Sequence, residues 1–354
     1  MNMRLLSTPM LLAAALVTTA PRTTPAQTER KTVPGNTVAI YNLAGKVTVE
    51  AGTGSDVVVE ITRGGHDAAK LGVEVGDVQG RNALRIVYPG DDIVYPSLGR
   101  WSNSSFSMDR DGTWGGDRKW LGGRRVRIRG GGSGLEAWAD LRILVPNGKK
   151  VDVNIGVGTM DATNVHGDLK LDVGAAHVTT HGTVGNLTID AGSGGASVRD
   201  ASGGNISVET GSGGIDVDQV AGGSCKFDTG SGGLTGGRVA CDDVTIDVGS
   251  GSVRLADVKS ARIKADAGSG GITLALLLAP HALNVDAGSG GVTVTLPAST
   301  GADVDIETGS GGIESDFPLT VDRFERHHVR GRIGDGAGRI RIEAGSGSVR
   351  LRKS

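Results

Sequence analysis

The chain has 354 residues, a formal net charge of −2 and 60 glycines, and only 3% of its residues are aromatic. The near-zero charge argues against a general nucleic-acid binder. The scarcity of aromatic side chains argues against a thick globular core and suits a thin one filled by Val, Ile, Leu and Ala.

Residues 1–26 have the pattern of a secretory signal peptide. Arg4 gives a positively charged start, Leu5–Val17 is a short apolar run, and Thr24-Pro25-Ala26 resembles a cleavage site. We expect export across the inner membrane, to the periplasm or the cell surface, and a short linker over residues 27–36. No cysteine follows the apolar run as in a lipoprotein, and no later segment is long enough to span a membrane as a helix.

Residues 37–87 are expected to begin the fold. The segment Val47–Ser55 (VTVEAGTGS) closely resembles a late segment of the chain, Ile340–Ser348 (IRIEAGSGS). The chain is therefore predicted to start and finish with the same kind of structural unit. Apolar and polar residues alternate over Leu71–Val87, which predicts further strands near this end.

Residues from about 88 to 134 break the pattern, because they are rich in Gly, Ser, Arg and aromatic residues. A long insertion in a compact body is usually either functional or irregular. One interpretation is a flexible loop, or a flap over an open end of the body. The other is a ligand site, because aromatic rings stack on sugars and arginines pair with anions. The candidate ligand-binding residues are Tyr95, Trp101, Trp114, Trp120, Arg124 and Arg125.

The stretch from Leu187 to Leu296 carries a repeat. Asp190-Ala-Gly-Ser-Gly-Gly195 recurs with small changes, so that the first glycine of each copy falls about 19 residues after the last. Such a period indicates a solenoid. Apolar and polar residues alternate on both sides of each Gly-Ser-Gly-Gly. This pattern predicts two short strands joined by a sharp turn, in which the glycines supply positive φ.

One repeat cannot bury its own apolar side, but stacked copies can. We expect each strand to pair in parallel with its equivalent one repeat away, about 4.8 Å along the axis, which gives a parallel β-helix. A hairpin meander is the alternative, but it gives no reason to keep the same outward acid in every copy. Residues 37–352 are predicted to form one all-β solenoid domain with rungs of about 19 residues. In it, 322–338 is a charged insertion and 343–351 is the final rung.

Several motifs resemble those of the DUF4097 group of bacterial proteins, which lies close to the DUF2807 group. They are Val145-Pro-Asn-Gly148, the recurring Gly-Ser-Gly-Gly followed by Ile or Val, and Arg332-Ile-Gly-Asp-Gly336. The resemblance covers most of residues 37–352. It implies a right-handed, single-stranded parallel β-helix, and the group often carries the label "putative adhesin". It brings no catalytic residue with it, and the aromatic insertion is not a feature associated with the family.

The outward acids of successive repeats should form a ladder. Stacked carboxylates repel one another, so either turn amides and serine hydroxyls satisfy them or they bind divalent cations such as calcium. The acids are Asp172, Asp190, Glu209, Asp228, Asp247, Asp266, Asp286, Glu307 and Glu343. His166, His177 and His181 lack a third ligand for zinc, so no metal site and no cofactor is predicted.

Cys225 falls at an inward strand position and Cys241 at a corner of the next repeat. An exported protein can form a disulfide, but the two positions are about three residues out of line, which strains the separation that a bridge requires. The sequence therefore favours free cysteines packed as small apolar side chains.

The predicted function is that of a secreted cell-envelope solenoid of a non-enzymatic, binding or scaffold type, with an envelope glycan or protein as its partner. A polysaccharide-processing enzyme is one alternative. Such chemistry needs two distinguished carboxylates, whereas the acids here are regular and exposed. A purely structural stalk or assembly subunit is the other alternative.

Overall fold

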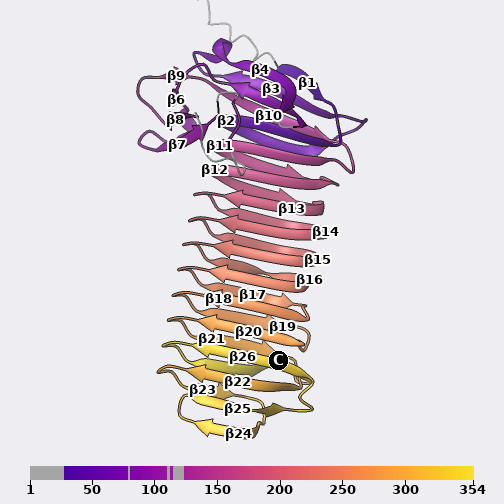
Figure 1. The fold of residues 1–354 in the computed structure, drawn as a ribbon, viewed down its shortest axis with the longest axis vertical. Helices are drawn as coiled ribbons and strands as arrows, with labels where there is room; N and C mark the ends of the chain where they lie inside the picture. Colours follow the sequence, from indigo (N-terminus) through magenta and orange to yellow (C-terminus); the bar gives the residue numbers. More distant parts are fainter. Residues whose placement is uncertain (1–27, 79, 110–111, 115–122) are drawn as a thin grey trace, which may run out of the picture.

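The computed structural model describes residues 28–78, 80–109, 112–114 and 123–354, so the expected signal peptide lies outside the described residues. The described residues form an all-β body whose strands lie across a long axis, one above the next (Figure 1). They contain no α-helix and only two short 3-10 helices, Ala68–Lys70 (η1) and Pro96–Leu98 (η2). The stack has the form of a solenoid, as the repeat predicted.

The central part of the solenoid is built from parallel strands whose partners lie 18 to 20 residues apart. β14 (Ala196–Thr210) pairs with β15 (Ile215–Thr229), for example, so that Glu209 lies beside Asp228. A Gly-Ser-Gly turn follows each of these long strands, and the next rung repeats the arrangement. The other strands of this part are β11 (Lys150–Thr163), β12 (Asp168–His181), β13 (Val184–Ala191), β16 (Leu234–Val248), β17 (Val253–Val258), β18 (Arg262–Ala267), β19 (Ile272–Leu276), β20 (Ala282–Ala287) and β21 (Val292–Leu296).

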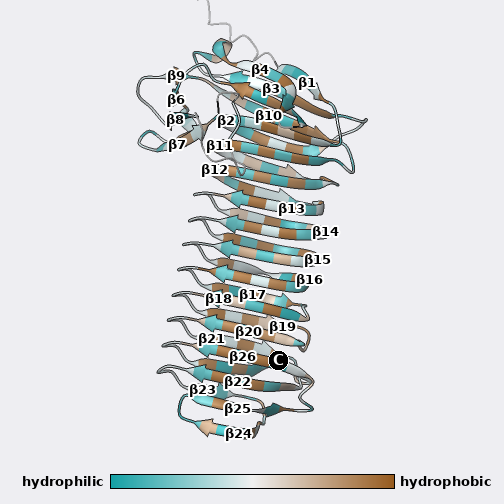
Figure 2. Ribbon diagram, in the orientation of Figure 1, coloured by the Kyte–Doolittle hydropathy of each residue, from teal (hydrophilic) through white to brown (hydrophobic). Residues whose placement is uncertain are grey.

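The core is a narrow column of aliphatic side chains between the two arms of each rung. In β15, Ile215, Val217 and Val220 are buried on one arm and Cys225 and Phe227 on the other. Figure 2 shows the resulting alternation of hydrophobic and hydrophilic residues along the strands. Full burial of one Val, Leu or Ile contributes about 1.5–3 kcal/mol. Because equivalent positions are buried on every rung, the solenoid is stabilised along its whole length.

Close stacking of the rungs, and not positive φ, explains the glycines of the turns, so the sequence-based explanation is wrong. None of the glycines in the Gly-Ser-Gly-Gly turns has positive φ. A Cβ at Gly213 would lie 2.1 Å from the carbonyl oxygen of Gly194 in the preceding turn. Positive φ occurs instead at the opposite corner of the rungs, at Asp200, Gln219, Arg238 and Asp257.

Cys225 and Cys241 form a disulfide between neighbouring rungs, so the expectation of free cysteines is wrong. Cys241 pairs with Gly222, three residues before Cys225. In a straight strand, inward side chains lie an even number of residues apart. Val220 and Cys225 both point into the core, so the chain turns a corner between them, and the two cysteine Cα atoms come within 6.0 Å. Because of this corner, the two cysteines lie closer together than their positions along a straight strand would indicate.

The last rung in the sequence is not the last rung in space. β26 (Gly338–Ala344) lies between β20 and β22 (Ala302–Thr308), and it pairs in parallel with both. β27 (Val349–Lys353) lies in the same way between β21 and β23 (Ile313–Ser315). The prediction of 343–351 as the final rung therefore holds for the sequence but not for the stack.

The charged segment before this rung forms a hairpin at the end of the solenoid. Its strands are β24 (Thr320–Glu325) and β25 (His328–Ile333), and β25 pairs antiparallel with β22. The hairpin covers the edge of β22, while β24 forms a new edge with charged side chains. Charged edges of this kind oppose further strand pairing.

The first rung is also enclosed by its neighbours. β2 (Thr37–Ala51) pairs in parallel with β11 on one side, and with β5 (Arg81–Val87) and β10 (Trp138–Val145) on the other. Antiparallel strands extend this end of the body: β1 (Thr28–Val33), β3 (Val57–Gly64) and β4 (Gly72–Val78). Residues 27–36, expected as a linker, thus contain a paired strand.

Candidate ligand-binding site

The described residues between β5 and β10 form a second sheet of four strands, whereas one interpretation of the sequence was a flexible loop, or a flap over an open end of the body. β8 (Arg124–Arg129) pairs antiparallel with β7 (Asn103–Met108) and parallel with β6 (Asp92–Val94). β9 (Leu135–Glu136) completes the sheet beside β6. Figure 1 shows this small sheet beside the N-terminal end of the solenoid.

One face of the small sheet is apolar and packs on the solenoid. Val126 and Ile128 of β8 and Met108 of β7 are buried, and they belong to the same hydrophobic cluster as the rungs. Phe106 lies so close to the solenoid that a Cβ at Gly174 would be 2.1 Å from its ring. The sheet is therefore anchored on a rigid body, which keeps its other face in a fixed position.

The opposite face is polar and basic, because successive side chains of a strand point to opposite sides. The cross-strand pairs on it are Arg129–Asn103, Arg127–Ser105 and Arg125–Ser107. Residues two apart on a strand are separated by about 6.8 Å. The β8 arginines consequently form a row beside a parallel row of small hydroxyl and amide side chains.

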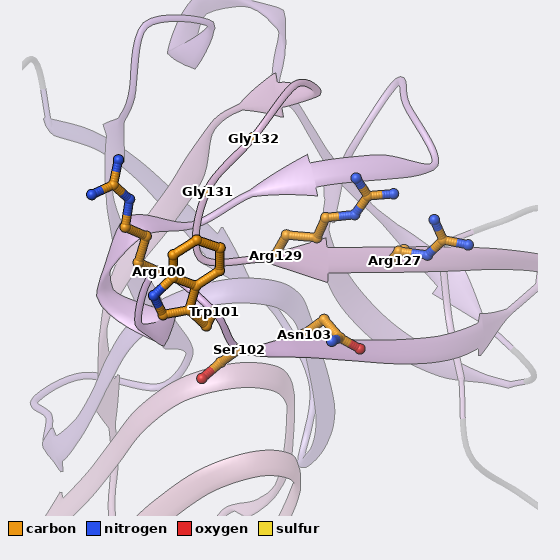
Figure 3. A pocket seen from close by; sticks show the side chains of 8 residues that line it. All are labelled: Arg100, Trp101, Ser102, Asn103, Arg127, Arg129, Gly131 and Gly132. Carbon is orange, nitrogen blue, oxygen red and sulfur yellow. The ribbon is translucent and has the colours of Figure 1, made fainter.

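An open cavity of about 520 Å³ lies at one end of this basic face (Figure 3). Trp101 lines the cavity with 90% of its surface exposed. The guanidinium carbon of Arg100 lies 5.9 Å from the centre of the Trp101 ring. The residues that line the cavity are Arg100, Trp101, Ser102, Asn103, Arg127, Arg129, Gly131 and Gly132.

The positive charge of this face is only partly neutralised. A carboxylate oxygen of Asp92 lies 3.0 Å from a nitrogen of Arg129 and 3.7 Å from one of Arg127. Within the described ranges, no acidic side chain forms an ion pair with Arg100 or Arg125. Arg127 and Arg129 therefore share one acidic partner in the part of the chain that the structure describes. Salt and water screen such exposed charges. The attraction between these arginines and an anionic ligand therefore grows when the ligand displaces the water.

Of the six residues predicted to bind a ligand, Trp101 lines the cavity. Arg125 lies on the same face of the sheet, outside the cavity lining, and Trp120 lies outside the described residues. Tyr95 is buried, with its ring centre 5.7 Å from that of Trp138. Its burial also raises the pKa of Tyr95. Tyr95 therefore packs within the insertion, and it borders a second, smaller cavity of about 290 Å³ and not the one beside Trp101.

Trp114 and Arg124 have structural contacts as well. The ring of Trp114 meets that of Tyr41 edge-on, with 5.5 Å between the ring centres. Arg124 donates a hydrogen bond of 2.7 Å to the carbonyl oxygen of Tyr88 and pairs with Asp91 at 2.8 Å. Both side chains thus fasten the insertion, and neither lines the cavity.

Sequence reasoning missed Arg100, Asn103, Arg127 and Arg129. A signal for Arg127 and Arg129 was present, because Arg and apolar residues alternate over residues 125–129. Ser alternates with Phe and Met over residues 105–108 in the same way. Alternation of this kind predicts strands with one polar face, whereas the prediction from sequence chose the adjacent pair Arg124 and Arg125.

The predicted ladder of outward acids runs along the solenoid, with one change of order. Glu343 lies between Asp286 and Glu307, because the last rung is inserted between theirs. Burial, followed by the charges of Asp266 and Glu343, raises the pKa of Asp286. Among the residues that the structure describes, no group of three or more His, Cys, Asp or Glu side chains could hold a metal ion.

Within the described ranges, no helix has the length and hydrophobicity to cross a membrane. No curated protein matches the chain. The crystal structure of a "putative cell adhesion protein" from Clostridium sporogenes aligns with 12% identity over 93% of this chain and 99% of that one, with a TM-score of 0.24. The family described as Toastrack DUF4097 matches residues 143–352, which contain the solenoid from β11 onward. The chain therefore belongs to the DUF4097 family.

Proposed function

We propose that this protein is an exported, non-enzymatic binding module of the cell envelope, carried by a right-handed parallel β-solenoid. The supporting observation is the cavity beside Trp101, where an indole with 90% of its surface exposed lies next to incompletely neutralised arginines. Tryptophan and arginine are enriched among the residues that dominate binding energies. A partner that covers the exposed indole removes apolar surface from water, which contributes favourably to binding.

The proposed partner is an envelope glycan or protein, met in the periplasm or at the cell surface. The disulfide between Cys225 and Cys241 supports export, because disulfides persist in oxidising compartments. The signal-like pattern of residues 1–26 agrees with export. In this proposal the solenoid is the scaffold, and the small sheet is the surface that it presents.

A non-enzymatic role agrees with the chemistry of the cavity. Among the described residues that line it, none is Asp, Glu, His or Cys. Cleavage of a glycosidic bond commonly uses two carboxylates at a set separation. The acids of the solenoid are spread over successive rungs in a regular column. Asp172 and Asp286, whose pKa burial raises, lie several rungs apart and do not form such a pair.

The proposal is tested by binding of the purified protein to an array of envelope glycans and envelope proteins. Wild type is compared with Trp101→Ala and with a matched control, Phe324→Ala, in which a 79% exposed aromatic residue is removed from the other end of the solenoid. We expect a ligand that wild type and the control bind and that Trp101→Ala does not. Equal binding by all three proteins would contradict the proposed site.

The same preparations separate the alternatives. Incubation with polysaccharides should release no products, and product formation would support an enzyme. Failure of wild type to bind any envelope component would support a structural stalk. Point variants are preferable to deletion of the insertion, because deletion would remove Val126 and Ile128 from the hydrophobic cluster.

A further inference from the structure

We infer that the ligand of the basic sheet face is an acidic polysaccharide whose sugar units carry carboxylates, a polyuronate. The inference rests on the proposed binding function and adds the chemical class of the ligand. It is carried by the residues around the cavity, which combine guanidinium groups, small polar side chains and one flat aromatic face. Each of these three features matches a different part of such a sugar chain.

The arginine row matches repeated carboxylates. Arg127 and Arg129 project from the same face of β8 and share Asp92 as their acidic partner. A guanidinium group forms two parallel hydrogen bonds with a carboxylate, and one aspartate cannot satisfy two guanidinium groups in this way. Their spacing of about 6.8 Å along the strand allows two different charged groups of one extended chain to be bound.

Trp101 and the polar row match the rest of the sugar. One face of a sugar ring consists of C–H groups, and an exposed indole offers it a flat apolar surface. The guanidinium carbon of Arg100 lies over the Trp101 ring, 5.9 Å from its centre, and adds a further cation beside the indole. Asn103 and Ser105, beside Arg129 and Arg127, can exchange hydrogen bonds with sugar hydroxyls.

The remaining charges of the chain disfavour a more densely charged ligand. The net charge is −2, and a column of outward carboxylates runs along the solenoid. Nucleic acids carry a phosphate at every nucleotide and are bound by many basic contacts together with several stacked aromatic residues. The cavity offers a single tryptophan. A sugar chain with one charge per unit and intervening hydroxyls fits this surface better, and an acidic peptide has no ring face for Trp101.

The test compares three oligosaccharides of one length: a polyuronate, the same chain with its carboxylates reduced to alcohols, and a sulfated neutral chain. Affinities are measured by isothermal titration with the wild-type protein. We expect the polyuronate to bind at least about tenfold more tightly than the reduced chain, because charge-assisted hydrogen bonds are lost. Its affinity should also fall as salt is raised.

Single-residue variants test which side chains bind the polyuronate. Arg127→Gln, Arg129→Gln and Trp101→Ala should each weaken binding by about tenfold or more. Arg254→Gln has the same change of charge on an exposed position of β17, and it should bind like wild type. Circular dichroism verifies that the arginine variants are folded, and Trp101→Ala removes a side chain that is too exposed to matter for folding.

The outcomes separate the inference from the proposed function. Equal affinity for the polyuronate and its reduced form, with loss in Trp101→Ala, would overturn the inference and leave the binding function in place. Tighter binding of the sulfated chain, of single-stranded DNA or of an acidic peptide would also overturn it. Absence of binding to all of these and to the envelope array would overturn both.

Discussion

Two neighbouring glycines of one turn should differ strongly in their tolerance of substitution by alanine. A Cβ at Gly213 would lie 2.1 Å from the carbonyl oxygen of Gly194 and 2.3 Å from its carbonyl carbon. A Cβ at Gly214 would meet nothing closer than a carbonyl oxygen at 3.3 Å. Neither glycine has positive φ, so only the space between rungs distinguishes Gly213→Ala from Gly214→Ala.

The contacts around Gly213 set the size of the expected destabilisation. To accept Gly213→Ala, the two turns must separate by about 1 Å, which strains tight packing at a cost of about 1–3 kcal/mol. The separation also weakens hydrogen bonds between the rungs, such as the 2.9 Å bond from Gly211 to Ala191, each with a net value of about 1 kcal/mol. We expect Gly213→Ala to lower the free energy of unfolding by about 3 kcal/mol. Gly214→Ala should stay within about 0.5 kcal/mol of wild type.

Urea denaturation followed by circular dichroism of the strands measures both variants against wild type. If the two substitutions destabilised the protein equally, backbone conformation and not rung spacing would explain the glycines. Equal tolerance of both would mean that the turns are not stacked as closely as the structure has them.

Three further predictions concern the stability of the solenoid. Replacing Cys225 and Cys241 by serine should lower the free energy of unfolding by about 3 kcal/mol, the value for a loop of this size, because the cysteines are 16 residues apart; urea denaturation equal to that of wild type would contradict the role of the bridge. Gln219 has a φ of 58°, so Gln219→Gly should raise the melting temperature by relieving a strain of about 1–2 kcal/mol, whereas Gln219→Ala should not. Burial and the neighbouring Asp190 raise the pKa of Asp172 above its ordinary 3.8. The folded state then binds more protons, and stability falls as the pH rises through the folded-state pKa; Asp172→Asn should therefore be more stable than wild type at about pH 7, and this advantage should vanish at about pH 3, below both pKa values.

The repetitive part of the fold was predictable because the sequence states its register directly. Glu209 and Asp228 occupy equivalent places in two copies of the repeat, and the structure pairs them. Alternation of apolar residues also indicated which side chains form the core. The disulfide was missed because a corner between Val220 and Cys225 shortens the path that a straight strand would take.

The order of the end rungs could not be predicted from the same signals. Segments 304–309 and 340–345 have nearly the same pattern, Val-Asp-Ile-Glu-Thr-Gly and Ile-Arg-Ile-Glu-Ala-Gly. Either could stack on β20 and bury the same face. The hairpin β24–β25 determines which of the two segments stacks on β20. It covers β22 and returns the chain to the space between β20 and β22.

The binding site depended on recognising short strands inside an irregular-looking segment. Trp101 was identified by its type alone, whereas Arg127 and Arg129 required the prediction of β8 and of its pairing with β7. Tyr95 and Trp114 could not be separated from Trp101 by composition, because burial of an aromatic residue depends on long-range contacts such as those with Trp138 and Tyr41.

Radical footprinting of the native protein, resolved by mass spectrometry, tests most directly whether the small sheet is the binding face. Trp101 is 90% exposed, so it should react rapidly in the free protein. With saturating polyuronate, or with any ligand found on the envelope array, labelling of Trp101 should fall several-fold while that of Phe324 stays constant. Unchanged labelling of Trp101 together with protection along the acidic column of the solenoid would contradict the account.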